Sequence, residues 1–260
     1  MGSVTYADGV SILQLIAYLP SFFVSSFLVY RHGIRSSGGF IFLVIFTLVR
    51  IVGACCELAT IHNPSTGIYI AAAICSSIGL SPLLMACSGM LSRANQSMAR
   101  PILHRLTFTA FRVTTIVALA LTVSGITWNM TPEALKTPNT EVKVGMILYF
   151  VSWVLLCVGL AVLFLRRSKI AEGENRNLLA VAVCVPFLLI RTIYALLLWF
   201  VANNTFNALD GNTTVQLVMS VLEEMVIVFV CLGIGFTLHV REKNWKSVPN
   251  KEAELREEMA

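Results

Sequence analysis

The chain has 260 residues, of which 57% are hydrophobic and 13% are charged, and its formal net charge at pH 7 is +5. A soluble domain usually carries about 25% charged residues, so this composition excludes an ordinary water-soluble globular fold. Basic loops beside anionic lipid headgroups account for the positive charge, so we expect membrane lipid and no nucleic acid as a partner.

The hydrophobic residues form blocks of about 20 residues, the length that an α-helix needs to cross the hydrocarbon core of a bilayer. No internal repeat, low-complexity stretch or interdomain linker separates these blocks. The predicted fold class is all-α, with one polytopic membrane domain over residues 1–240 and a charged tail over residues 241–260. Its seven transmembrane helices are expected at residues 9–30, 39–61, 68–91, 106–128, 144–165, 178–201 and 215–239.

The first predicted helix, residues 9–30, carries Gln14 and Tyr18 within an otherwise hydrophobic segment. No positive charge precedes it, and it is too long for the hydrophobic part of a cleavable signal peptide, so we expect it to remain as a signal anchor. The second predicted helix contains Arg50 and Glu57. These two residues are two helical turns apart and therefore project from the same face.

The third and fourth predicted helices offer fewer candidate side chains. The third is rich in small residues around Pro82, which is more typical of close helix packing than of a binding site. The fourth contains Arg112 near its basic end, where the side chain can extend to the headgroups. All seven cysteines lie in predicted helices, which indicates packing residues rather than disulfides: Cys55, Cys56, Cys75, Cys87, Cys157, Cys184 and Cys231.

The sixth and seventh predicted helices carry the remaining polar residues. Arg191 lies in the middle of the sixth helix, with Tyr194 one turn further on and Trp199 near the outer end. Trp199 is typical of an interfacial aromatic belt, and a position lining a cavity stays open. In the seventh helix, polar residues recur at helical spacing: Gln216, Ser220, and Glu223 or Glu224.

Positive charge lies almost entirely on one side of the predicted bundle. Apart from the intramembrane arginines, only Lys136 and Lys143 of the 19 lysines and arginines fall on the other side. Cytosolic loops carry such an excess, so the N-terminus is predicted outside or in the lumen and the C-terminus in the cytosol. Glycosylation sequons begin on the predicted outer side at Asn129, Asn203 and Asn212. We expect a glycoprotein of the endoplasmic reticulum, with the plasma membrane as an alternative.

Five ionisable residues are expected in one layer of the outer half of the membrane: Arg50, Glu57, Arg191, Glu223 and Glu224. Each charge there costs about 2.5–3.5 kcal/mol on insertion scales unless it is paired or hydrated. If each arginine pairs with one carboxyl, one carboxyl is left without a cation, and burial favours its neutral, protonated form. A network that only holds helices together remains an alternative.

The signatures of several other classes are missing. No lysine lies in a predicted helix, which excludes a retinal Schiff base. The third helix ends in Leu91, Ser92 and Arg93 rather than an acidic-Arg-aromatic triplet, which argues against a G-protein-coupled receptor. There is no Asp-rich motif, Gly-rich phosphate loop or Cys/His spacing typical of a metal site, so we expect no metal and no cofactor.

Through four stretches, the chain resembles a large group of fungal seven-helix membrane proteins of mostly unknown function: RIVGACCELATI at 50–61, IGLSPLLMACSGMLSR at 78–93, VPFLLIRTIYALL at 185–197 and VQLVMSVLEEMVIVF at 215–229. It also resembles integral membrane terpene cyclases of the ascochlorin and macrophorin type. Such cyclases need no metal, because they protonate an alkene or epoxide of a linear prenyl chain and let a carbocation cascade run in an apolar cavity. The resemblance implies an isomerase or lyase of fungal terpenoid or meroterpenoid secondary metabolism.

By analogy with those cyclases, the general acid would be Glu57, Glu223 or Glu224, with Arg50 and Arg191 orienting it or holding a polar end of a prenylated substrate. Acid-initiated cyclisation requires a protonated carboxyl in a dry pocket. Residues expected to line the substrate site around these five are Gln14, Tyr18, Tyr194, Trp199, Gln216 and Ser220.

Two other functions stay open. Intramembrane acids and arginines can relay protons in a lipid or drug transporter, although no internal repeat of the transporter kind is present. The chain could also be a seven-helix sensor or scaffold in which the charges only set helix packing.

Overall fold

The computed structural model describes residues 6–33, 39–61, 65–98, 101–127, 140–170, 173–201 and 213–238. These residues form helices and short turns only. The sequons at Asn129, Asn203 and Asn212 and the predicted tail over residues 241–260 lie outside the described residues.

The helices follow one another in chain order as α1 (Tyr6–His32), α2 (Phe40–Ala59), α3 (Thr66–Ile78), α4 (Leu80–Gln96), α5 (Arg105–Thr127), α7 (Thr140–Leu165), a short 3-10 turn η1 (Arg167–Lys169), α8 (Asn175–Phe200), α9 (Thr213–Gln216), a π-helical turn η2 (Leu217–Val221) and α10 (Leu222–Thr237). In the described part of the chain, seven helical segments are long and apolar enough to cross a membrane. The predicted all-α fold with seven spans is confirmed, and the chain has the character of an integral membrane protein. The orientation of its ends remains a prediction.

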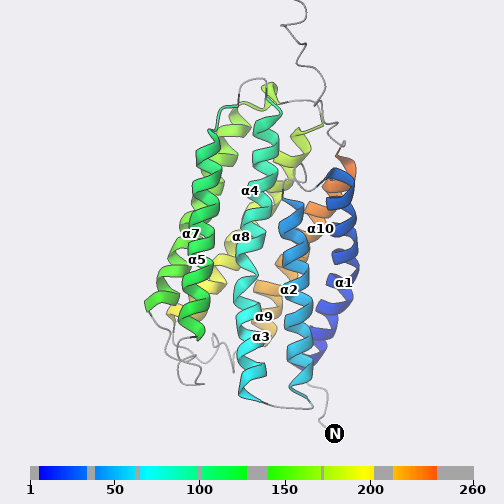
Figure 1. Cartoon of the computed structure of the whole chain (residues 1–260), viewed down its shortest axis with the longest axis vertical. Helices are drawn as coiled ribbons and strands as arrows, with labels where there is room; N and C mark the ends of the chain where they lie inside the picture. The colour runs from blue at the N-terminus through cyan, green and yellow to red at the C-terminus, as the bar shows by residue number, and fades with distance from the viewer. Residues whose placement is uncertain are drawn as a thin grey trace, which may run out of the picture.

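The spans stand side by side as an upright bundle, and α4 lies in the middle of it (Figure 1). Helix α4 packs against α2, α5, α7 and α8, while α1 packs against α2 and α10. Every residue of α4 from Leu80 to Asn95 is buried. Helix α4 is part of the third predicted helix, which is rich in small residues. Small side chains allow the surrounding helices to pack closely against α4, whereas bulky ones would hold them apart.

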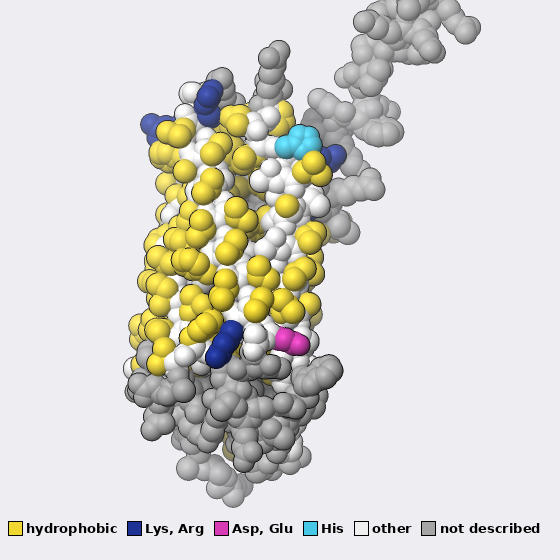
Figure 2. Space-filling model, turned by 90° about the vertical axis from the view of Figure 1, so that its left-hand side faces the viewer, with side chains coloured by type: hydrophobic (Ala, Val, Ile, Leu, Met, Phe, Trp, Pro, Cys, Tyr) yellow, Lys and Arg dark blue, Asp and Glu magenta, His cyan; other side chains and the backbone are white. Residues whose placement is uncertain are grey.

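The outer surface of the bundle is hydrophobic over its middle part. Figure 2 shows one such face, on which charged side chains are seen only towards the two ends. Many large side chains of α5 and α7 are exposed, among them Val113, Ile116, Ile147, Val154, Leu155 and Val158. A broad apolar surface of this kind is expected where helices contact lipid, since a helix satisfies its backbone hydrogen bonds within itself.

The third span, Ile74–Gln96, bends locally at Gly79 between α3 and α4, where the backbone keeps α-helical dihedral angles but the regular hydrogen bonding is interrupted. Pro82 has no N–H with which to bond the carbonyl of Ile78, four residues earlier. Instead, Ser81 Oγ donates a hydrogen bond to Ile78 O at 3.2 Å. The last carbonyls of a helix have no partner within it, so the interruption leaves acceptors at the end of α3 for side chains of other helices.

The last span contains a π-helical turn at Leu217–Val221. Such a turn accommodates one extra residue and rotates the side chains that follow it. Glu223 and Glu224 come directly after the turn and are 8% and 0% exposed. Adjacent helical residues point about 100° apart, so this part of α10 is enclosed by neighbouring helices over a wide angle.

Asn95 organises the turn between α4 and α5. Its Oδ1 accepts hydrogen bonds from the N–H groups of Ile102 and Leu103, both at 3.1 Å, and its Nδ2 donates to Leu103 O at 2.8 Å. The same turn borders a pocket that includes His104, at the opposite end of α4 from Gly79.

We expect Asn95→Ala to lower the free energy of unfolding by about 1–3 kcal/mol, because it removes three hydrogen bonds between the buried Asn95 amide and the backbone of the turn. Thermal unfolding of the purified protein in detergent measures the change. The matched control is Gln96→Ala, since Gln96 is exposed and makes one side-chain hydrogen bond, to Ser92. Its effect should stay within about 0.5 kcal/mol, and equal effects of the two variants would contradict the role given to Asn95.

Candidate functional site

Arg50 of α2, Arg191 of α8 and Glu224 of α10 form a buried group that we call the Arg–Glu–Arg cluster. Glu224 Oε1 accepts a hydrogen bond from Arg50 Nη2 and another, at 2.7 Å, from Arg191 Nε. The exposed fractions of the three side chains are 5%, 4% and 0% in chain order. Because one carboxylate is shared by two guanidinium groups, the cluster has a formal charge of +1 within the bundle.

The interruption between α3 and α4 completes the surroundings of both arginines. Arg191 Nη2 donates a hydrogen bond to Ser76 O, one of the last carbonyls of α3, at 3.1 Å. Gly79 makes room for the other arginine, because a Cβ atom at this position would lie 2.8 Å from Arg50 Nη2. The break in the third span therefore supplies an acceptor for Arg191 and space for Arg50.

Aromatic rings lie beside both guanidinium groups. Arg50 Cζ is 5.6 Å from the centre of the Phe46 ring, and the Tyr18 ring packs edge-on against Phe46. Arg191 Cζ is 5.8 Å from the centre of the Tyr194 ring. The faces of aromatic rings attract cations, so these rings help to hold positive charge in a region away from water.

Four buried polar atoms in this region lack a hydrogen-bond partner among the described residues: Tyr18 Oη, Arg50 Nε, Glu223 Oε2 and Glu224 Oε2. Tyr18 is close enough to interact electrostatically with all three members of the cluster, and Glu223 with Arg191 and Glu224. Buried polar atoms in native proteins are nearly always bonded to protein, water or a ligand. Donors and acceptors that are both unsatisfied indicate a place for a small polar group.

The predicted charge layer is brought together only in part. Arg50, Arg191 and Glu224 meet, as their similar predicted depths imply. Glu57 is partly buried and accepts a hydrogen bond from Ser11 of α1 at 2.5 Å. The sequence interpretation paired each arginine with a different carboxyl, whereas in the structure both arginines form ion pairs with Glu224. Within the described ranges, Glu57 and Glu223 therefore form no ion pair.

The other candidate residues lie mainly inside the bundle. Gln14, Tyr194, Trp199 and Ser220 are between 1% and 9% exposed, and Gln216 is partly buried. Trp199, at 3%, is enclosed by the chain rather than directed to lipid as a belt residue would be.

Helix α1 presents a polar stripe that the sequence interpretation recognised only in part. Asp8, Ser11, Gln14 and Tyr18 recur every three or four residues, and all four are buried. Their spacing places them on one helix face, and this spacing is the signal that could have identified Asp8 and Ser11. The α1 stripe includes Ser11, which donates a hydrogen bond to Glu57, and Tyr18, whose ring packs on Phe46.

A family model described as a domain of unknown function, DUF7702, matches residues 4–241. The chain belongs to the DUF7702 family. The match includes all seven spans, and with them the Arg–Glu–Arg cluster and the α1 stripe. No curated protein and no solved structure matches the chain. The DUF7702 description states no activity.

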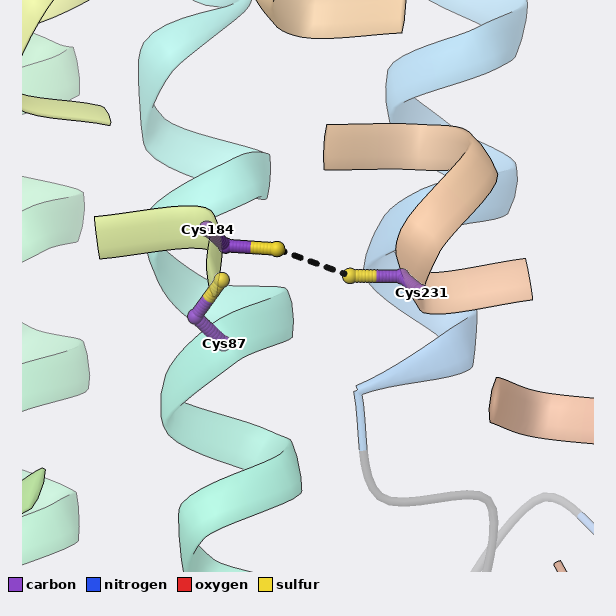
Figure 3. A group of neighbouring side chains, drawn as sticks. All are labelled: Cys87, Cys184 and Cys231. Atoms are coloured by element: carbon purple, nitrogen blue, oxygen red, sulfur yellow. Dashed lines mark hydrogen bonds between the residues drawn. The ribbon is translucent and has the colours of Figure 1, made fainter. Parts of the chain in front are cut away.

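A second group of side chains in this DUF7702 domain consists of Cys87 of α4, Cys184 of α8 and Cys231 of α10, which are all fully buried. Their sulfur atoms lie within 4.8 Å of one another, and the Sγ atoms of Cys184 and Cys231 are 3.9 Å apart. Figure 3 shows the three thiols converging from separate helices. Because each cysteine comes from a different span, spacing along the chain gave no metal signature.

Gly79→Ala is expected to destabilise the protein by about 1–3 kcal/mol, because the added methyl group displaces the Arg50 guanidinium from its packed position. Unfolding in detergent measures the difference. Gly67→Ala in α3 is the control: a Cβ there meets no atom within 4 Å, and alanine is favoured over glycine in a helix by roughly 0.5–1 kcal/mol. A Gly79→Ala protein as stable as Gly67→Ala would contradict the close contact with Arg50.

Proposed function

We propose that the chain is a membrane-embedded, metal-independent terpene cyclase that protonates an alkene or epoxide of a linear prenyl chain. The observation that carries the proposal is Glu223, a buried acid whose Oε2 has no partner among the described residues and which lies beside a carboxylate already shared by two arginines. Burial of a carboxyl that has no ion-pair partner among the described residues favours the neutral acid, and the neutral acid is the form that can donate a proton.

The two neighbouring glutamates have different surroundings, which suits different roles. Glu224 accepts hydrogen bonds from both Arg50 and Arg191. Glu223 keeps its proton until a substrate accepts it. Pairs of carboxyls in unlike environments are a general way to separate an acid from a fixed charge in one site.

The reaction begins when Glu223 transfers its proton to an alkene carbon or an epoxide oxygen. The prenyl chain then carries the positive charge, and its double bonds close rings in turn. The Glu223 carboxylate that is left lies within electrostatic reach of Arg191. The last carbocation loses a proton to a base, so the product is an isomer of the substrate and no oxidant or metal is consumed.

The side chains around the cluster suit such a substrate. The rings of Tyr18, Phe46 and Tyr194 lie beside cationic groups, and the faces of aromatic rings attract carbocations in the same way. The Tyr18 hydroxyl, which has no hydrogen-bond partner among the described residues, can donate to an oxygen atom of the substrate. A lipid-soluble prenylated compound can reach the bundle from the bilayer, which fits a fungal terpenoid pathway in the endoplasmic reticulum.

The test incubates the purified full-length protein in lipid nanodiscs with linear prenylated phenols that end in an alkene or in an epoxide. Mass spectrometry and chromatography should detect a cyclic isomer of the same mass. In heavy water, the alkene substrate should gain one deuterium at the carbon that is protonated. Recovery of every substrate unchanged in this assay, and in a host that expresses the chain and is fed the same compounds, would reject the proposal.

A proton-coupled transporter of amphipathic molecules is the second candidate, and local departures from α-helical hydrogen bonding in two spans favour it. The break at Gly79 and the π-helical turn at Leu217–Val221 flank the buried charges, and transporters bind their cargo at discontinuous helices near the bilayer midplane. Flux of a chemically unchanged lipid into proteoliposomes, dependent on a pH gradient, would support transport over cyclisation.

A further inference from the structure

The three buried thiols of Cys87, Cys184 and Cys231, which we call the thiol cluster, lie in the continuous hydrophobic core of the bundle. No other His, Cys, Asp or Glu of the described residues joins them at metal-ligand distance. The cluster is separate from the proposed acid site, although the two are related by helix geometry. Cys184 comes seven residues before Arg191 in α8, and Cys231 comes seven residues after Glu224 in α10. Seven residues are two turns, or about 10 Å of helix, so the thiol cluster lies on the same inward faces, two turns away.

The distances suit three sulfur ligands around one ion. A metal–thiolate bond is about 2.3 Å long, so sulfur atoms at the corners of a planar triangle around the ion lie about 4 Å apart. The Sγ atoms of Cys184 and Cys231 are 3.9 Å apart, and all three sulfurs lie within 4.8 Å of one another. Small rotations of the cysteine side chains, which move each sulfur by a few tenths of an ångström, would bring all three sulfurs to bonding distance of one ion without moving a helix.

The helices hold this geometry in place. Cys87 lies in α4, whose residues are buried from Leu80 to Asn95. Trp153 Nε1 of α7 donates a hydrogen bond to Val185 O, next to Cys184, at 3.1 Å. The three thiols are therefore fixed by the packing of the bundle before any ion binds, which lowers the entropic cost of forming a site.

Ligand type and number select the ion. Thiolates favour soft metals such as Cu(I), Zn(II) and iron–sulfur clusters. Structural zinc takes four ligands, and iron–sulfur clusters of the common kinds are also held by four residues, whereas the described residues offer three. We infer that the thiol cluster is a binding site for one Cu(I) ion in three-coordinate sulfur geometry. This inference goes beyond the proposed cyclase and does not depend on it.

Metal binding to cysteine releases protons, because the thiolate is the form that binds the ion. Coordination of one Cu(I) ion by all three sulfurs therefore displaces three thiol protons, which leave to water, and the loaded site has a formal charge of −2. Uptake of copper should accordingly be weaker at low pH.

The experiment uses the full-length protein, purified anaerobically in nanodiscs with ascorbate and loaded with one equivalent of Cu(I). Copper retained after competition with a bicinchoninate chelator is measured per chain, and X-ray absorption at the copper edge reports the ligands. We expect one copper per chain, three sulfur neighbours, and a rise in the unfolding temperature on loading. Cys87→Ala, Cys184→Ala and Cys231→Ala should each weaken binding by at least about tenfold.

Cys157→Ala is the matched control, because Cys157 is a partly buried thiol outside the cluster, and it should bind copper as the unchanged chain does. If a cluster variant fails to fold, as judged by circular dichroism, absorption spectra of the unchanged chain still decide the outcome. Copper bound through nitrogen or oxygen, equal retention by folded cluster variants, or preferential retention of Zn(II) over Cu(I) would each overturn the inference. A Cys184–Cys231 disulfide in freshly extracted protein would overturn it as well.

Discussion

Replacing Glu224 by glutamine is expected to lower the free energy of unfolding by about 3–5 kcal/mol, because Arg50 and Arg191 are then buried without a carboxylate. Both arginines depend on the same oxygen atom, Glu224 Oε1, so this one change removes two ion pairs. Thermal and chemical unfolding of the purified protein in detergent should report it. Glu57→Gln is the control, since glutamine can still accept from Ser11, and its effect should stay within about 1 kcal/mol.

A compensating variant tests whether Glu224→Gln is unstable because the two arginines lose their ion pairs or because glutamine packs poorly. Replacing buried ion pairs by hydrophobic residues of similar volume is often neutral or stabilising. The combination Arg50→Met, Arg191→Met and Glu224→Leu should therefore recover most of the stability that Glu224→Gln loses. A Glu224→Gln protein as stable as the unchanged chain would show that the cluster does not hold α2, α8 and α10 together.

Replacing Glu223 by glutamine is expected to slow cyclisation by about 10²–10⁴-fold, the usual contribution of a general acid. Glutamine has nearly the same shape but no acidic proton. Because Glu223 forms no ion pair with any residue that the structure describes, stability should change by less than about 1 kcal/mol. The measurements are the rate of product formation in nanodiscs and the unfolding midpoint of the same preparation.

Two further variants sharpen this result. Glu223→Asp retains an acid on a shorter side chain and should keep part of the activity, and Glu57→Gln should keep nearly all of it, because Glu57 lies against Ser11 rather than in the cluster. Full turnover by Glu223→Gln would remove Glu223 as the acid. Loss of turnover in Glu57→Gln alone would move the role to that residue.

The spans were predictable because a bilayer imposes one strong requirement, about 20 hydrophobic residues for each crossing. The meeting of Arg50, Arg191 and Glu224 was predictable for a related reason: a charge inside the membrane must find its partner at a similar depth. Counting residues from the ends of each helix was enough to estimate that depth. The depth of each charged residue along its helix axis can therefore be predicted from the sequence.

The rotation of each helix about its own axis, which decides the direction of its side chains, could not be predicted from the sequence. The π-helical turn at Leu217–Val221 determines which of Glu223 and Glu224 faces the arginines. No pattern in the sequence predicted that turn. The convergence of Cys87, Cys184 and Cys231 depends on the rotations of three helices at once. The space for Arg50 at Gly79 required knowledge of which side of the third span faces α2.

The burial of α4 from Leu80 to Asn95 has a consequence for how the protein is made. This segment carries Ser81, Ser88, Arg93 and Asn95 on its inner surfaces, and helices α7 and α8, which cover it, are synthesised later. A nascent third crossing would leave the translocon with those polar groups facing lipid and no partner yet available. We therefore expect it to be retained beside the translocon, or by an insertion chaperone, until the sixth crossing emerges.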